Sequence, residues 1–269
     1  MGRPPTVVSA RMNTMTTPER PRVTRELLVV LPTYNERATL PATVAGILAH
    51  LPAANILIID DGSPDGTGRL AAELSVDPRV TVRHRKGKQG LGTAYALGFQ
   101  MALERGYRFV AEMDSDGSHL PVELPRLLET ARKGYGLVIG ARWIRGGRIV
   151  NWPWARRAIS RTGTRVARTS LRSQLHDLTS GFRVLDTEWL ARLDFSKLDS
   201  QGYAFQVETA WTLERMGCPI AEVPITFVER TAGSSKMSPA IVWEALRNVL
   251  RWGWRLRADE RRARAGRRL

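Results

Sequence analysis

Short apolar runs alternate with longer stretches in which apolar residues recur at every third or fourth position. The apolar runs lie at 26–31, 56–59, 80–82, 109–113 and 136–139. Short continuous runs bounded by turn residues are typical of strands buried on both faces, whereas the spacing between them is typical of amphipathic helices. Their alternation predicts an α/β fold, with a mostly parallel sheet covered by helices on both faces.

The second half of the chain contains fewer predicted strands than the first half. A short strand is expected within 180–185. A helix is expected over 203–216, with its inward positions at Phe205, Ala210, Leu213 and Met216. The extended run from Ile220 to Val228 contains Pro224. Because proline cannot donate a ladder hydrogen bond, this run is predicted to lie at the edge of the sheet.

Two further predicted helices carry arginine in regular stripes. The first covers 153–172, and steps of three and four residues place its arginines on one face: Arg157, Arg161, Arg165, Arg168 and Arg172. The second begins at about Pro239 and has an apolar side formed by Val242, Leu246, Val249, Gly253 and Leu256. Its other features are Arg247, Arg251 and Arg255 and the tryptophans Trp243, Trp252 and Trp254. This combination is typical of a helix that lies in a membrane interface.

These patterns divide the chain into three parts. Residues 1–25 are rich in Thr, Pro and Arg without periodicity, which predicts a disordered basic tail. Residues 26–238 hold the predicted strands and helices of one domain. Residues 239–269 form the amphipathic helix and a basic end.

The net charge of +15 is concentrated in two segments. Residues 141–172 contain nine arginines and no acid, and residues 239–269 contain nine arginines and three acids. Such segments indicate an anionic partner: a nucleic acid, a phosphorylated ligand or a membrane surface. Arginine pairs with phosphate through two parallel hydrogen bonds, which favours phosphorylated headgroups.

Cysteine usage and hydropathy bear on localisation. The single cysteine, Cys218, excludes an internal disulfide and suits a reducing cytosol, where we expect a buried thiol. No run of about 18 apolar residues is present to span a bilayer, and no apolar signal segment is evident near the N-terminus. We therefore expect a cytoplasmic protein that is peripheral on the inner face of the membrane.

Acidic residues follow several of the predicted strands. Asp114 and Asp116 come at the end of the run 109–113, and Asp60 and Asp61 end the run 56–59. The carboxyl ends of parallel strands meet at one edge of the sheet, where open α/β sheets bind ligands. Two carboxylates there suit Mg²⁺ or Mn²⁺, with phosphate oxygens completing the shell. A nucleotide fits the same edge, because Tyr34 offers an aromatic face for a base and Asp61 can accept hydrogen bonds.

Several longer motifs strengthen this interpretation. They are Pro32-Thr33-Tyr34-Asn35-Glu36, Asp60-Asp61-Gly62-Ser63-Pro64-Asp65-Gly66-Thr67, Asp114-Ser115-Asp116, Gly140-Ala141-Arg142, Thr179-Ser180-Gly181-Phe182-Arg183 and Arg230-Thr231-Ala232-Gly233-Ser234-Ser235-Lys236-Met237. Together they resemble family 2 glycosyltransferases of the GT-A, Rossmann-like fold. The set is similar to dolichol-phosphate mannosyltransferases, including bacterial polyprenol monophosphomannose synthases, from about Leu27 to Ser238.

The resemblance implies inverting transfer of mannose from GDP-mannose to a polyprenyl monophosphate. It implies guanosine contacts from Pro32, Tyr34, Glu36, Ile59 and Asp61, and metal and diphosphate contacts from Asp114, Ser115 and Asp116. Arg230 and Lys236 would close over the donor phosphates and act with Asp116 in catalysis. The acceptor phosphate would meet Arg142, Arg156 and Ser160.

One departure from the family concerns the metal. Where many relatives have Gln as a third metal ligand, this chain has Ser118, a poorer ligand that leaves the choice between Mg²⁺ and Mn²⁺ open. A phosphomonoester is mostly dianionic at pH 7, so its attack requires no general base. His119 is therefore expected to be structural, and Glu208 either orients the sugar or is a carboxylate on a helix surface.

Two alternative functions stay open. A related enzyme would add glucose from UDP-glucose to the same lipid phosphate. A nucleic-acid-binding protein would also explain the sequence pI of about 11.1, but the basic helices carry interfacial tryptophans and no nucleic-acid motif, so no nucleic acid is expected as a partner. The expected partners are GDP-mannose, polyprenyl phosphate and an anionic membrane surface, and a membrane-anchoring partner protein is left open.

Overall fold

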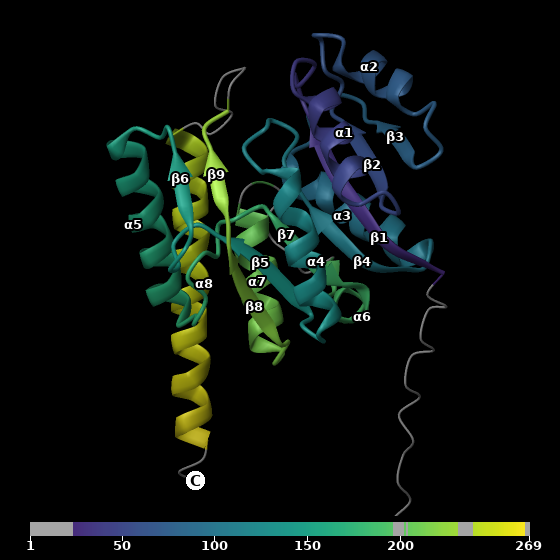
Figure 1. The fold of residues 1–269 in the computed structure, drawn as a ribbon. Helices are drawn as coiled ribbons and strands as arrows, with labels where there is room; N and C mark the ends of the chain where they lie inside the picture. The colour runs from purple at the N-terminus through teal and green to yellow at the C-terminus, as the bar shows by residue number, and fades with distance from the viewer. Residues whose placement is uncertain (1–23, 196–201, 203, 231–238, 267–269) are drawn as a thin grey trace, which may run out of the picture.

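A seven-stranded sheet forms the centre of the computed structural model, which describes residues 24–195, 202, 204–230 and 239–266. The strand order is β3-β2-β1-β4-β7-β5-β8 (Figure 1). The strands are β1 (Arg25–Thr33), β2 (Asn55–Asp60), β3 (Val80–His84), β4 (Tyr107–Glu112), β5 (Leu137–Ala141), β7 (Arg183–Asp186) and β8 (Ile220–Pro224). All neighbours in the sheet pair in parallel except β7, which is antiparallel to both β4 and β5. The prediction of a mostly parallel sheet is confirmed.

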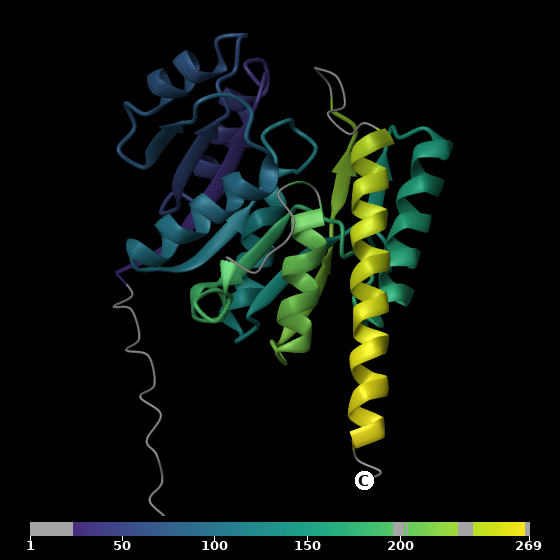
Figure 2. The ribbon, with the colours of Figure 1, turned by 180° about the vertical axis from the view of Figure 1, so that it is seen from behind.

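Helices cover both faces of this sheet, as predicted. Strand residues alternate between the faces, so that in β1 Leu28 and Val30 enter one core cluster and Leu27, Val29 and Leu31 the other. The second cluster is closed by α1 (Leu40–His50), α2 (Thr67–Leu74) and α4 (Leu124–Arg132), which a 3-10 turn over Pro121–Glu123 precedes. The first is closed by α3 (Leu91–Glu104), α6 (Thr187–Leu190) and α7 (Ala204–Arg215), seen from behind in Figure 2.

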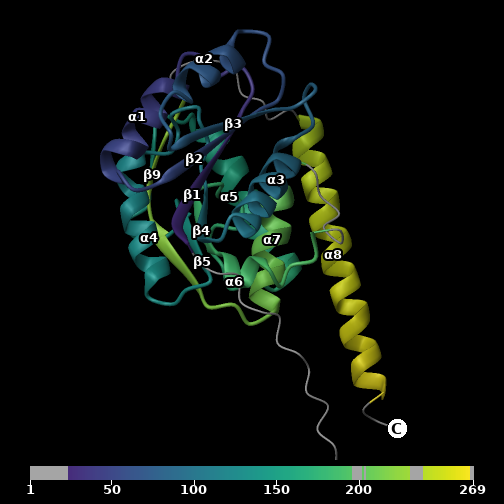
Figure 3. The same ribbon diagram turned by 90° about the vertical axis from the view of Figure 1, so that its right-hand side faces the viewer.

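A second layer lies beside the far end of the sheet. Two short parallel strands, β6 (Arg148–Val150) and β9 (Thr226–Val228), precede the long helices α5 (Trp154–Leu171) and α8 (Pro239–Gly266). The two helices lie side by side in Figures 1 and 2, and a Cβ on Gly253 would come within 2.6 Å of the Ser170 carbonyl oxygen. The C-terminal part of α8 extends past the rest of the body (Figure 3). Among the described residues, no helix is both long enough and apolar enough to cross a bilayer.

The structure corrects three details of the sequence prediction. Met216 follows the end of α7 and is 40% exposed, so it does not face inward. Trp252 is buried and stacks on Trp211 with ring centroids 6.2 Å apart, so it belongs to the core and not to an interfacial face. Strand β6 was not predicted, because its three residues are exposed or half-buried and carry no apolar pattern. The edge position of β8 and the burial of Cys218 are confirmed.

Candidate active site

The predicted donor residues gather where the sheet changes direction. From β1 the chain proceeds to β2 and β3 on one side and later returns to β4 on the other, so β1 and β4 flank the switch point at which open α/β sheets bind ligands. The loops after these strands are joined directly, because the Ser115 hydroxyl donates to the Pro32 carbonyl at 3.0 Å. The metal motif and the first donor loop therefore meet at one place.

The loop after β1 is held in a fixed turn. Asn35 has a positive φ of 58°, and its backbone N–H donates to the Ser63 hydroxyl at 3.0 Å. Glu36 is buried, with its backbone N–H donating to Thr67 Oγ1 at 2.9 Å and its carboxylate accepting from Thr39 Oγ1 at 3.1 Å. Tyr34 precedes this turn and is half-buried. The turn therefore presents Tyr34 beside the loop after β2.

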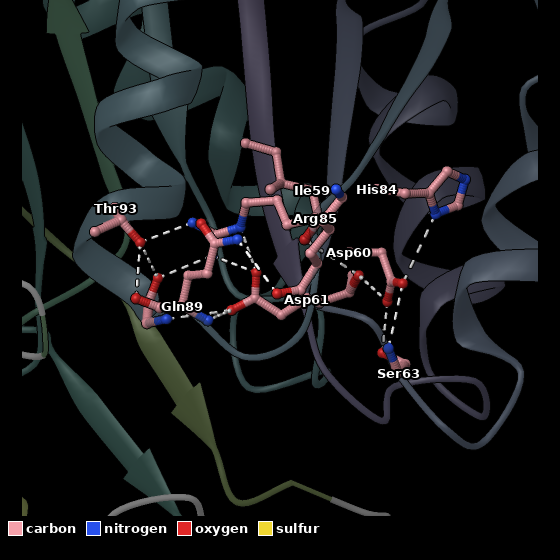
Figure 4. A network of polar contacts seen from close by, with 11 residues as sticks. Ile59, Asp60, Asp61, Ser63, His84, Arg85, Gln89 and Thr93 are labelled. Carbon is pink, nitrogen blue, oxygen red and sulfur yellow. Dashed lines mark hydrogen bonds and ion pairs between the residues drawn. The ribbon is translucent and has the colours of Figure 1, made fainter.

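Asp60 ends β2, Asp61 follows it, and the two serve different parts of the site (Figure 4). Asp60 accepts from the hydroxyl of Ser63 at 2.5 Å and so shapes its own loop. Asp61 accepts from Arg85 and from the backbone of the following loop, with Gln89 N at 3.1 Å. Ile59, predicted to contact guanosine, has a fully buried side chain in the core below. Of these two acids, Asp61 is thus the one that contacts the next loop of the site.

Asp114 and Asp116 lie in the tight turn after β4. Asp116 accepts from the backbone N–H of Ser118 at 2.9 Å, and Gly117 between them has a positive φ of 81°. Asp114 has a side chain that is 34% exposed, and its Oδ1 lies 3.5 Å from the hydroxyl of buried Tyr95. The more exposed of the two carboxylates thus opens towards solvent, while the other is fixed by the turn.

This pair fits a divalent cation that shares its shell with a ligand. Carboxylates are hard oxygen donors, and Mg²⁺ is commonly held by one or two of them together with substrate phosphates. Within the described part of the chain, no cluster of three or more His, Cys, Asp or Glu side chains could hold a metal without such help. Ser118, the predicted third ligand, is buried and uses its N–H on Asp116 and its carbonyl on Val228 N at 3.1 Å.

Arg230 lies directly against the metal motif. Its Nη2 is 3.0 Å from Asp116 Oδ2, and both side chains are largely buried. The residue comes just after β9, whose Val228 is tied to the carbonyl of Ser118. Lys236, predicted to act with Arg230, lies outside the described residues. The guanidinium of Arg230 therefore lies beside the metal motif.

His119 is buried in the floor of the site. Its ring stacks on Phe182 with centroids 4.9 Å apart and meets Phe227 edge-on, while Nδ1 accepts from the backbone N–H of Asp114 at 3.0 Å. Burial lowers the pKa of His119 to about 4, so the ring is neutral at pH 7. These contacts give it the structural role that the sequence favoured.

A charged pair is buried behind the metal motif. Glu112 and Arg183 are both fully buried, and Arg183 Nε lies 3.8 Å from Glu112 Oε2. Burial raises the pKa of Glu112 to about 7, and the charge of Arg183 offsets part of the rise. Arg183 also donates to the carbonyls of Leu178 and Gln206 at 2.7 Å each. Glu208, on the same helix as Gln206, is buried, so its interpretation as a surface carboxylate is wrong.

The predicted acceptor residues lie in two environments. Arg142 is buried and binds Asp177 through Nε at 2.9 Å and Nη2 at 2.7 Å. Burial alone would lower the pKa of Arg142, but the Asp177 carboxylate outweighs it and leaves the pKa raised. Arg156 is partly exposed, binds Glu229 at 2.5 Å and lies 4.3 Å from the ring centroid of Trp152. Ser160 follows one turn later on the same face of α5.

Three partners of these residues were not predicted from the sequence. Asp177 holds Arg142, Glu229 holds Arg156, and Arg85 holds Asp61. The positions of two of them in the sequence could have marked them as candidates. Asp177 is the first acid after the acid-free segment 141–172, and Glu229 adjoins Arg230. Pairing across the chain is set by the fold, and no spacing in the sequence predicts it.

Known proteins share both the sequence and the fold of this chain. The model of "Glycosyl transferase family 2" matches residues 28–194. Relatives include "Polyprenol monophosphomannose synthase" of Mycolicibacterium smegmatis, 47% identical over 91% of this chain and 93% of its own, and "Undecaprenyl-phosphate mannosyltransferase" of Micrococcus luteus, 48% identical over 89% of this chain and 99% of its own.

Among solved structures, glucosyl-3-phosphoglycerate synthase from Mycobacterium tuberculosis, crystallised with Mn²⁺, UDP and phosphoglyceric acid, shares the fold. It has a TM-score of 0.64 at 21% identity and covers 86% of this chain and 79% of its own. The GT-A fold class predicted from the motifs agrees with this likeness. With a family match that spans most of the chain, this protein belongs to glycosyl transferase family 2.

Proposed function

We propose that the protein transfers mannose from GDP-mannose to a polyprenyl monophosphate with inversion, giving a β-mannosyl phosphoryl polyprenol. The observation that carries the proposal is the position of the dipeptide after β9. Arg230 contacts Asp116 of the metal motif at 3.0 Å, and its neighbour Glu229 contacts Arg156 of α5 at 2.5 Å. The groups expected to hold the donor and the acceptor therefore adjoin. The names of the two relatives, which cover nearly all of this chain, support the same reaction.

On the donor side, the residues present fit a divalent cation. Asp114 and Asp116 would hold Mg²⁺ or Mn²⁺ together with the diphosphate, and the ion would neutralise charge on the departing GDP. Arg230 supplies a second positive charge from the protein beside the same phosphates. Tyr34 offers its ring to the base, and Asp61 offers a hydrogen-bond acceptor. Lys236 is proposed to assist Arg230.

On the acceptor side, attack needs positioning and not deprotonation. The second pKa of a phosphomonoester is about 6, so the acceptor is mostly a dianion at pH 7 and can attack directly. Arg156 and Ser160, one turn apart on α5, would hold this phosphate together with Arg142. His119 and Glu112 do not serve as a base, because His119 is packed between aromatic rings and Glu112 is fully enclosed. Catalysis then rests on orientation and on charge neutralisation.

A lipid acceptor also requires contact with a membrane. Helices α5 and α8 expose large apolar side chains, with Trp154 83%, Trp243 66% and Trp254 71% exposed. Exposed arginines accompany them on the same helices: Arg157, Arg161, Arg165, Arg247, Arg251 and Arg255. Aromatic anchors with cationic neighbours suit an anionic bilayer surface, where each arginine contributes about 1 kcal/mol. We infer that the exposed sides of α5 and α8 dock the protein on the cytoplasmic leaflet.

A donor comparison tests the proposed reaction. The purified protein is given farnesyl phosphate with Mg²⁺ or Mn²⁺ and either GDP-mannose or UDP-glucose. The proposal expects a glycosyl phosphoryl lipid from GDP-mannose only, with β-anomeric coupling in its NMR spectrum. Product from UDP-glucose alone, or an α-linked product, would contradict it.

A further inference from the structure

The loop between β3 and α3 is pinned to the carboxylate that we propose binds the base. The N–H groups of Gln89 and Gly90 donate to Asp61 Oδ2 at 3.1 and 3.3 Å, and Arg85 donates to Asp61 Oδ1 (Figure 4). Arg85 also donates to the Gly90 carbonyl at 3.0 Å. Because both ends of the loop bind one carboxylate, its backbone has a fixed position relative to Asp61.

Lys88 extends from the middle of this loop to Tyr34. The lysine is exposed, and its Nζ lies 5.0 Å from the centroid of the Tyr34 ring. The ammonium therefore occupies a place on the ring where a base would stack. A cation–π contact at an exposed position is weak, and the four-carbon stem of lysine is flexible. A base that stacks on Tyr34 can thus displace Nζ from the ring, and Nζ can then donate to the edge of that base.

The chemistry of this pair matches guanine. Guanine carries two adjacent acceptors, O6 and N7, and lysine commonly donates to this edge. Adenine has an amino donor where guanine has O6, and a pyrimidine such as uracil lacks the N7 acceptor beside its carbonyl. We propose that Lys88 selects guanine by donating to its O6 and N7 edge, an inference that rests on the proposed GDP-mannose donor.

Nucleotide binding tests this role without any transfer reaction. Calorimetry with Mn²⁺ measures the affinity of the full-length protein for GDP, UDP and ADP. Lys88→Met is expected to weaken GDP binding about tenfold, the loss of one base-edge contact, with less than about a twofold change for UDP. Lys88→Arg, which keeps two parallel donors, is expected to retain the preference for GDP.

A matched control separates base recognition from charge. Lys86 lies two residues away on the same exposed loop, so Lys86→Met removes the same charge and is expected to leave all three affinities within about twofold. Equal losses for GDP and UDP in Lys88→Met, or no loss, would overturn the role of Lys88 while the donor proposal stands. A wild-type protein that binds UDP better than GDP would overturn both.

Discussion

Asp177 holds Arg142, one of the predicted acceptor residues, in place. It is fully buried and accepts both the guanidinium and the backbone N–H of Arg142, the latter at 2.8 Å. Asp177→Asn would leave the buried Arg142 charge without its counter-ion, which costs about 3–5 kcal/mol. Urea unfolding is expected to show a loss of that size. Glu188→Gln, which breaks an exposed pair with Arg192 at 3.1 Å, should cost less than about 1 kcal/mol; equal losses would contradict this account.

Glu112 predicts a pH dependence of stability. Its pKa is raised by burial from 4.5 to about 7 in the folded protein, so between these values the folded state binds more protons than the unfolded state. The stability of the wild type therefore falls as the pH rises through this window, and Glu112→Gln removes that term. Relative to wild type, the free energy of unfolding of Glu112→Gln should increase by roughly 3 kcal/mol between pH 4.5 and pH 7. Parallel pH profiles would contradict the shift.

At the scale of elements, the contact between α5 and α8 depends on Gly253. A Cβ there would come within 2.6 Å of the Ser170 carbonyl oxygen, a backbone atom that cannot swing away. Gly253→Ala is therefore expected to lower the thermal stability, although alanine is the better helix former by about 1 kcal/mol. Gly163 on α5 meets nothing within 4 Å, so Gly163→Ala should raise it. A gain in both variants would show that the helices are not in close contact.

The exposed faces of these helices make a prediction for the membrane. Replacing Trp243 and Trp254 by Ser is expected to weaken sedimentation with anionic liposomes several-fold, because both side chains are mainly exposed. The same variant should keep the thermal stability of the wild type. Trp252→Ser should lower the thermal stability and leave liposome binding unchanged, since its ring is buried against Trp211. Unchanged liposome binding in the first variant would argue against docking through this face.

For the molecule as a whole, periodicity predicted most elements and the edge of the sheet that holds the site. Continuous apolar runs ended by acids located the switch point, because their pattern follows from burial on both faces. The antiparallel direction of β7 was not predictable, since a strand of four residues has the same pattern in either direction. Trp252 was assigned to the wrong side of α8 because a tryptophan suits a membrane interface and a core equally well.

The candidate site was predicted in its residue types but not in its pairing. The family resemblance named Asp116, Arg230, Arg142 and Arg156, whereas the contacts that place Arg142 and Arg156 come from Asp177 and Glu229. These acids are distant in sequence from their arginines, and only the packed fold brings them together. Sequence motifs therefore predict which charged side chains belong to the site, and the fold determines which of them form ion pairs.

The central claim is that Asp114 and Asp116 would hold a divalent cation against the donor diphosphate, while mannose passes from the nucleotide to a lipid phosphate. The most direct measurement gives the purified protein radiolabelled GDP-mannose, Mn²⁺ and a polyprenyl phosphate and counts the label that moves into organic solvent. We predict Mn²⁺-dependent transfer by the wild type and a loss of at least about a hundredfold in Asp114→Asn and Asp116→Asn, each folded as the wild type. Label that stays in the aqueous phase with wild type, or equal transfer by either variant, would contradict the claim.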